Sequence, residues 1–226
     1  MLSAGAAKGL VQALADRFEA ETGVRVEASF DSAGATRDAF VNGAACDIVI
    51  LPAPMHDALA SQRRIDADSI AALGRVATGV AIARGDRVPA LADADALRAC
   101  LVAATALYCP DTVRATAGIH FAGVLRSLGI DETSLQKLRT YPNGARAMAA
   151  LAENGEKGAL GCTQVTEILC TPGVVLVAPL PAPFELATTY AVAVSANAAS
   201  PARAFAALLA SREAQAIRRA GGFFER

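Results

Sequence analysis

Apolar and polar positions follow two different periods over residues 1–75. Apolar side chains at Leu10, Leu14 and Phe18 recur at the spacing of an amphipathic helix. Val24–Phe30 alternates residue by residue, as a strand does, and Cys46–Pro52 has the apolar run of a strand buried in a parallel sheet. The resulting order β-α-β-α-β-α predicts an open α/β layer built on a parallel sheet.

Two longer apolar runs, 76–83 and 190–195, stand apart from this alternation. We interpret each run as a strand that crosses from one lobe of the molecule to another. Residues 1–80 together with 185–226 are therefore expected to form lobe one, and residues 81–184 are expected to form lobe two. The predicted fold class is α/β with two lobes.

Lobe two continues the alternation of strands and helices. Strands are predicted at 106–110 and 159–162, and a short helix is predicted around Ser134–Leu138. The last part of the chain is helical, with a first helix that begins at Ser200-Pro201, a typical helix start. We expect these last helices to pack on lobe one.

One local pattern recurs: a strand ends, small residues follow, and a helix begins at once. The first backbone N–H groups of a helix have no internal partner and carry partial positive charge, so they attract anions. Small side chains let a ligand approach those amides, although the same pattern also fits an ordinary βα turn. The recurrence predicts an anion site built from the segments Ser3–Lys8, Asp31–Thr36, Thr116–Gly118 and Asn143–Ala145, with a weaker fifth case at Thr163–Thr166.

Composition excludes several classes of function. The chain has 226 residues with 21 basic and 22 acidic side chains and no basic run, which argues against nucleic acid as the main partner. No apolar stretch reaches the roughly 18 residues of a membrane span.

The five cysteines lack CxxC spacing, and their odd number leaves at least one thiol outside any intramolecular disulfide. Neither a metal spacing nor a phosphate-binding GxxxxGK[ST] loop is present, so no metal and no cofactor is expected.

The beginning of the sequence bears on localisation. Met1-Leu2 leads directly into the first predicted strand, without the pattern of a signal peptide. The protein is therefore expected to be periplasmic if a targeting segment was removed, and cytoplasmic otherwise. The short first strand favours a trimmed start.

Several of these stretches resemble the periplasmic molybdate-binding protein family, part of the type II solute-binding proteins of ABC transporters. The resemblance implies a two-lobe fold with two crossing hinge strands and the ligand in a cleft between the lobes, at helix N-termini. It covers nearly the whole chain and is carried by Ser3–Ala7, Glu21–Val24, Ser29-Phe30 with Ser32 and Gly34, Asn42–Ile48, Ala117–His120 and Tyr190–Val194.

The resemblance also implies ligand contacts, and here the chain departs from the family. The family binds a tetrahedral oxyanion through two serine hydroxyls, one tyrosine hydroxyl and backbone amides. The serine positions correspond to Ala6 and to Ala33 with Ser32 beside it, and the tyrosine position corresponds to Gln164. The amide positions fall at Ala117 and Gly144. Each neutral donor lost from a desolvated anion site costs ~1–3 kcal/mol, so the sequence predicts a ligand other than molybdate or tungstate.

A carboxylate is the predicted replacement, because it favours charge-assisted donors. Arg114 precedes the third small-residue segment and is the preferred candidate among four arginines, ahead of Arg37, Arg75 and Arg146, which are otherwise read as surface side chains. The complete predicted ligand-binding set is Ala6, Ala7, Ser32, Ala33, Gly34, Arg114, Ala117, Gly118, Asn143, Gly144 and Gln164.

Three functions remain open. The first is a monomeric solute-binding protein that hands a small anion to an ABC-transporter permease. The second is an enzyme on the same scaffold, since the family is similar to an aconitate isomerase, with His120, Asp111 or Glu167 as candidate bases. The third is a cytoplasmic module that senses an effector.

Overall fold

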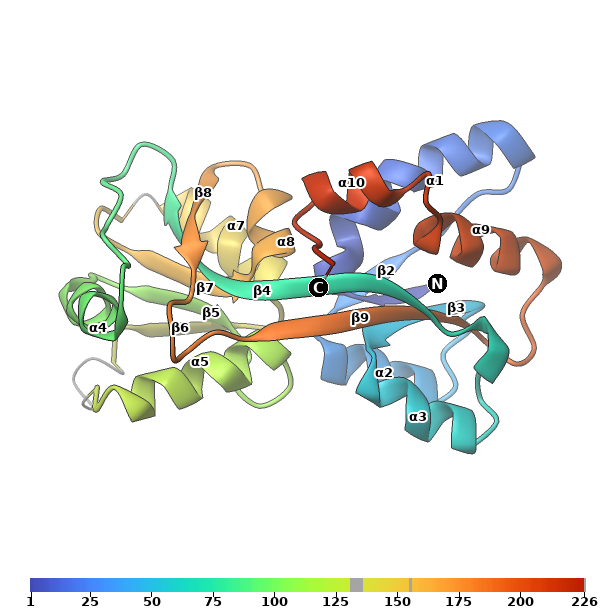
Figure 1. Cartoon of the computed structure of the whole chain (residues 1–226), viewed down its shortest axis with the longest axis horizontal. Helices are drawn as coiled ribbons and strands as arrows, with labels where there is room; N and C mark the ends of the chain where they lie inside the picture. Colours follow the sequence, from blue (N-terminus) through green and yellow to red (C-terminus); the bar gives the residue numbers. More distant parts are fainter. Residues whose placement is uncertain (131–135, 155, 226) are drawn as a thin grey trace. The chain divides into compact units, whose positions relative to one another are not determined.

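The computed structural model describes residues 1–130, 136–154 and 156–225, which form two compact units. Unit 1 comprises Met1–Val76 and Thr188–Arg226, and unit 2 comprises Ala77–Ala187. Two long strands, β4 (Ala71–Ala83) and β9 (Ala187–Val194), each carry residues of both units (Figure 1).

Unit 1 is built on a sheet of strand order β2-β1-β3-β9. The strands β1 (Leu2–Ala4), β2 (Ser29–Asp31) and β3 (Ile48–Pro52) are parallel, and β9 pairs antiparallel with β3. Since the chain returns to the same edge after each parallel strand, the carboxyl ends of β1, β2 and β3 lie together. Each of these ends leads directly into a helical segment.

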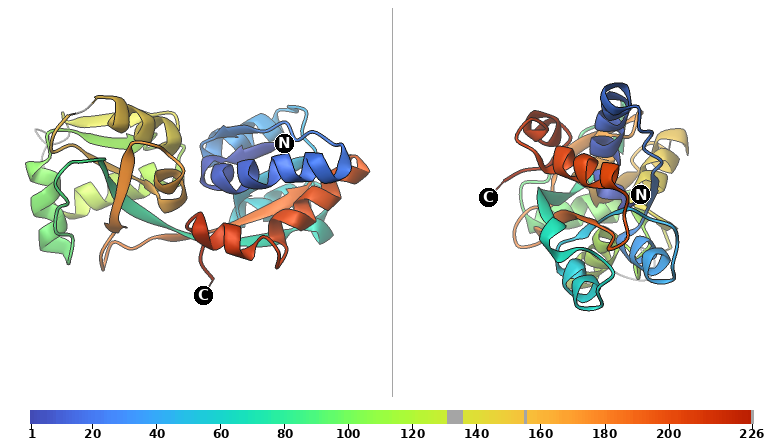
Figure 2. Two further views of the ribbon diagram at one scale, coloured as in Figure 1. Left: turned by 90° about the horizontal axis from the view of Figure 1, so that it is seen from above. Right: turned by 90° about the vertical axis from the view of Figure 1, so that its right-hand side faces the viewer.

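Helices cover both faces of the unit 1 sheet (Figures 1 and 2). The first parallel strand is followed by a single 3-10 turn, η1 (Gly5–Ala7), before α1 begins. On one side lie α1 (Lys8–Thr22), α9 (Ser200–Ala210) and α10 (Gln215–Ala220), and on the other side lie α2 (Ala33–Val41) and α3 (Pro54–Ser61). The rings of Phe18 and Phe205 join α1 to α9, with centroids 5.0 Å apart. A second 3-10 turn, η2 (Ala67–Ser69), precedes β4.

Unit 2 is built on a sheet of order β4-β7-β5-β6, and β8 (Val174–Pro179) also pairs with β4. The strands β5 (Leu107–Pro110), β6 (Leu138–Tyr141) and β7 (Leu160–Gln164) are parallel, whereas β4 runs antiparallel to β7. The helices among the described residues of this unit are α4 (Ala94–Ala103), α5 (Thr116–Ser127), α7 (Gly144–Asn154) and α8 (Val165–Leu169).

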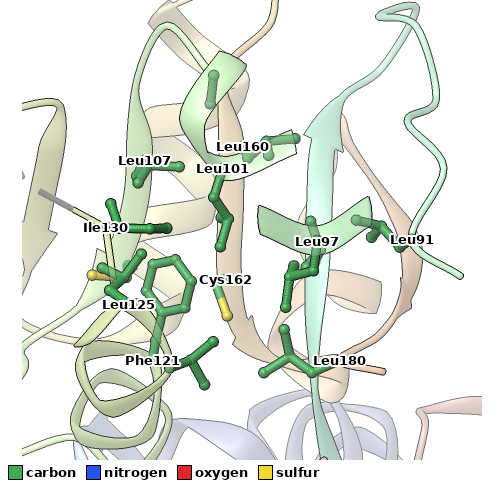
Figure 3. Close-up of a cluster of buried hydrophobic side chains, with 14 of the residues drawn as sticks. Leu91, Leu97, Leu101, Leu107, Phe121, Leu125, Ile130, Leu160, Cys162 and Leu180 are labelled. Carbon is green, nitrogen blue, oxygen red and sulfur yellow. The ribbon is translucent and has the colours of Figure 1, made fainter. Parts of the chain in front are cut away.

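Successive side chains of the unit 2 strands supply two separate apolar cores. Leu107 and Cys109 belong to the core shown in Figure 3, which also contains Leu97 from α4 and Phe121 from α5. Tyr108, which lies between them in β5, packs with Met148 of α7 in the other core. This alternation across a strand is the reason that a helix layer is needed on both faces.

Three predicted elements differ from the observed ones. The alternating segment Val24–Phe30 forms a ladder only from Ser29, where β2 pairs with the three-residue strand β1. The crossing strand predicted at 76–83 begins earlier, at Ala71. The short helix predicted around Ser134–Leu138 falls partly on 134 and 135, which lie outside the described residues, and Leu138 begins β6.

Among the described residues, none of the helices combines the length and the apolar character that a membrane crossing requires.

Candidate functional site

Both sheets place loops at the carboxyl ends of their parallel strands, where ligands bind in open α/β folds. In unit 1 these loops hold Ala6, Ala7, Ser32, Ala33 and Gly34. In unit 2 they hold the other predicted site residues, Arg114, Ala117, Gly118, Asn143, Gly144 and Gln164. The structure thus gives each unit one set of candidate groups, and a ligand shared by all of them stays a prediction.

The unit 1 set offers few side-chain donors. Ala6, Ala7 and Ala33 are buried methyl groups, so the two positions that correspond to serines in the resembling family carry no hydroxyl. Gly34 lies in the first turn of α2 and is buried as well. What remains in this set is the backbone and the side chain of Ser32.

Ser32 is the N-cap of α2. Its Oγ accepts a hydrogen bond of 3.4 Å from the backbone N–H of Ala35, and its own N–H donates to the Asp31 carboxylate at 2.7 Å. A hydroxyl that accepts one bond still has its proton to donate. Ser32 can therefore cap the helix and donate to an anion at the same time.

The loop before α5 is organised by Asp111. Its carboxylate accepts the backbone N–H groups of Val113 at 2.7 Å and of Arg114 at 2.9 Å. The side chain of Arg114 is exposed on this loop. Asp111 is thus a structural cap of the loop that presents Arg114.

Gly118 is small for a reason that the sequence does not reveal. A Cβ atom at this position would lie 2.2 Å from the carbonyl oxygen of Asp111 and 2.4 Å from that of Pro110. The glycine therefore lets α5 pack closely on the end of β5. Ala117, its buried neighbour, begins the same turn of helix.

The N-terminus of α7 contacts the buried carboxyl group of Glu167. Thr163 donates its hydroxyl to Glu167 Oε2 at 2.6 Å, and the backbone N–H groups of Gly144, Ala145 and Gln164 also bond this carboxylate. Burial raises the pKa of Glu167, and these four donors oppose the rise. The amide of Gly144, which we predicted to bind a ligand, bonds the chain's own carboxyl group, and its contact with a ligand stays a prediction.

The geometry around Gly144 fits this internal role. A Cβ atom there would lie 2.0 Å from Glu167 Oε2 and 2.1 Å from Thr163 Oγ1. Asn143, the other residue predicted at this place, accepts the backbone N–H of Arg146 at 3.0 Å and so caps α7.

Three buried polar side chains lie around the end of β7. Thr78 on β4 is the direct cross-strand partner of Gln164, and Thr166 follows two residues later in α8. Gln164 is 2% exposed, Thr78 1% and Thr166 4%. Within the described part of the chain, both amide atoms of Gln164 and both threonine hydroxyls have no hydrogen-bond partner. Burying such groups unpaired is costly, so this cluster is the strongest sign of a polar ligand or bound water in the molecule.

The sequence predicted Gln164 as a site residue and included Thr166 only in a weaker fifth segment, whereas Thr78 was missed. The segment Thr163–Thr166 carried a signal, because polar residues there follow a buried strand. The sequence around Thr78 gave no such signal, because only the register of β4 against β7 brings this residue opposite Gln164.

The candidate bases are all engaged in hydrogen bonds. His120 Nε2 lies 2.8 Å from the backbone oxygen of Phe184, Asp111 holds its loop, and Glu167 is buried at α7. Among the described residues, no three His, Cys, Asp or Glu side chains gather as a metal site would require.

The other arginines discussed as candidates take structural partners or lie on the surface. Arg37 pairs with the neighbouring Asp38, with Nη2 and Oδ1 2.7 Å apart. Arg75 lies over the ring of Phe224, 5.4 Å from its centroid, and Arg146 is exposed.

Comparison with known proteins extends over nearly the whole chain. Residues 1–224 match a family model described as bacterial extracellular solute-binding protein. An aconitate isomerase of a Pseudomonas species is 28% identical over 222 residues, which cover 95% of this chain and 82% of that protein.

Solved structures show the same fold. The periplasmic molybdate-binding protein of Azotobacter vinelandii superposes with a TM-score of 0.80 at 19% identity, over 100% of this chain and 98% of the other. The sulfate-binding protein SubI of Mycobacterium tuberculosis H37Rv gives a TM-score of 0.72 at 18% identity, over 98% and 84% of the two chains. The fold is that of the two-lobe type II periplasmic binding proteins, and the chain belongs to the family of bacterial extracellular solute-binding proteins.

Proposed function

We propose that this protein binds a small organic carboxylate and delivers it to an ABC-type importer from the periplasm. The observation that carries the proposal is the buried amide of Gln164, which has no partner among the described residues and lies at the carboxyl end of β7. A neutral amide can bind one oxygen of a carboxylate and also accept from a ligand donor.

The loss of hydroxyl groups argues against a compact tetrahedral dianion. Such an oxyanion accepts hydrogen bonds at every corner, and Ala6 and Ala33 offer only methyl groups at the corresponding positions. The carbonyl of Gln164 would repel an oxygen that points at it. The unit 1 set therefore lacks two side-chain donors, and Gln164 adds an acceptor to the unit 2 set, so neither set by itself suits a tetrahedral dianion.

Arg114 supplies the charge in this proposal. A guanidinium binds a carboxylate through two parallel N–H groups, in a charge-assisted and bidentate contact. The loop held by Asp111 leads from β5 into α5, so it presents Arg114 at the same edge of the sheet as Gln164.

A screen by thermal shift tests the proposal. A ligand at 100 times its Kd adds ~2.7 kcal/mol of stability, a shift that is easily measured. We expect stabilisation by one or more of citrate, malate, succinate and aconitate, and little by molybdate, sulfate or phosphate. A shift with molybdate alone would refute the proposal.

The variant Gln164→Leu tests whether the amide of Gln164 contacts the ligand. Removal of a buried amide without partners should leave the unliganded protein at least as stable as the wild type, while the ligand shift disappears. Gln136→Leu, at an exposed position of the same unit, is the control and should keep the shift.

An isomerase is the second candidate, because the similarity to the aconitate isomerase spans 95% of the chain. His120 would act as the base through Nδ1, since Nε2 donates its proton to the oxygen of Phe184 in that tautomer. Incubation with each geometric isomer of aconitate, followed by proton NMR, tests this candidate. Conversion that His120→Asn abolishes would replace the transport proposal, and no conversion at saturating protein would leave binding as the function.

A further inference from the structure

The buried cluster Thr78, Gln164 and Thr166 restricts the chemistry of the ligand beyond its charge. Each of these side chains is neutral, and each can both donate and accept a hydrogen bond. Among the described residues, none of them has a partner for either role. A ligand that fits the cluster must satisfy acceptors as well as donors.

The amide of Gln164 has the same hydrogen-bonding requirement in both of its possible orientations. Whichever way the group is turned, it presents one carbonyl oxygen, which only an O–H or N–H group can satisfy. A fully ionised carboxylate or oxyanion has no such group. A ligand that contacts this carbonyl directly, without a bridging water, must therefore carry a donor in addition to its carboxylates.

This inference rests on the proposed function, the binding of a small organic carboxylate. We propose that the cluster Thr78–Gln164–Thr166 receives a hydroxyl group, and that the ligand is a small hydroxycarboxylic acid. The cross-strand pairing of Thr78 with Gln164 places their side chains on one face, about 5 Å apart at Cβ, which suits a single hydroxyl between them.

An ammonium group fits less well than a hydroxyl. A buried ammonium needs a carboxylate partner, and the nearby Glu167 already accepts from Thr163 and three backbone amides. Four donors fill the acceptor sites of one carboxylate. A hydroxyl, by contrast, donates once and accepts twice without adding charge.

Calorimetric titration with pairs of acids that differ by one hydroxyl tests the inference. The pairs are citrate against tricarballylate and malate against succinate, with aspartate as the amino counterpart of malate. The wild type should bind the hydroxy acid of at least one pair ten-fold or more tightly than its deoxy partner. It should bind malate more tightly than aspartate.

Two variants connect this preference to the cluster. In Gln164→Leu and in the near-isosteric Thr78→Val, the ratio of affinities within the discriminated pair should fall towards one. Gln136→Leu, at an exposed position, should leave the ratio unchanged.

The outcomes separate this inference from the proposed function. Equal affinities within both pairs, tighter binding of the deoxy acid or of aspartate, or a ratio that both variants preserve, would overturn the hydroxyl assignment while carboxylate binding stands. Binding of none of these acids would overturn both.

Discussion

At the scale of single residues, two glycines show how a sequence pattern can have an internal cause. Gly118 and Gly144 both begin helices after parallel strands, as residues at an anion site do. A Cβ atom on Gly118 would collide with backbone oxygens of β5 and its loop, and one on Gly144 would collide with Glu167. Their small size serves contacts within the chain, so it is no evidence for a ligand.

Arg114 carries the charge in the proposed site and gives the first prediction. Arg114→Ala should weaken binding of the organic acid ten-fold or more, because a charge-assisted contact contributes about 1.5–3 kcal/mol. Isothermal titration measures the change. Arg126→Ala, in the last turn of the same helix α5, is the control and should change affinity less than two-fold. An equally small effect for Arg114→Ala would remove this arginine from the site.

His56 gives a prediction about pH. This side chain is buried in α3, and burial lowers its pKa, although nearby backbone groups of Ala53 and Pro52 oppose the shift. In the unfolded chain the imidazole binds a proton as the pH falls through about 6.5. The unfolded state then holds more protons than the folded state, so stability falls as the pH falls.

His56→Gln should therefore flatten the pH dependence of the unfolding free energy between about pH 7 and pH 5. One such group contributes at most about 1.4 kcal/mol per pH unit. Urea unfolding at several pH values measures the slope, and the difference near pH 8 isolates the packing effect of the substitution. An unchanged slope would contradict the assignment of a buried neutral imidazole.

At the scale of elements, the helix N-termini that share the pattern of strand end, small residues and helix start have different hydrogen-bond partners. The first turn of α2 is capped by Ser32, whereas that of α7 binds the carboxylate of Glu167. The N-terminus of α5 follows a loop that Asp111 holds. A recurring pattern of strand, small residues and helix thus describes the local fold, while side chains distant in sequence decide which ends can meet a ligand.

Gly144→Ala tests the contact between the N-terminus of α7 and the carboxyl group of Glu167. The added methyl group must displace Glu167 or Thr163, and overpacking of this kind costs on the order of 1–3 kcal/mol. Chemical denaturation should show that loss of stability. Gly123→Ala in α5 is the matched control, because the nearest atom to its Cβ is Arg126 Nη2 at 4.0 Å, and it should stabilise the protein by up to about 1 kcal/mol. If both substitutions stabilised the protein, the described packing of Glu167 would be wrong.

The sequence predicted the elements better than their ends. Period-two and helical patterns located the strands and helices that pack against a core, such as β3 and α1. The pattern at Val24–Phe30 overstated β2, because the length of a ladder depends on the neighbouring strand, which the segment itself does not encode.

At the scale of the whole molecule, non-contiguous segments build unit 1, and the chain enters and leaves unit 2 through β4 and β9. Long apolar runs indicated both strands. The candidate site could be predicted only in part, since its polar cluster depends on a register. Gln164 could be predicted because it stands where the resembling family has a tyrosine. Thr78 becomes its neighbour only through the pairing of β4 with β7.

The central claim is that this solute-binding protein prefers an organic carboxylate to molybdate, and direct titration calorimetry of the purified protein tests it. The titrants are citrate, malate, succinate and aconitate on one side and molybdate on the other, under the same buffer and salt. We predict that at least one organic acid binds ten-fold or more tightly than molybdate. Sub-micromolar binding of molybdate, with no heat from any of the organic acids, would contradict the claim.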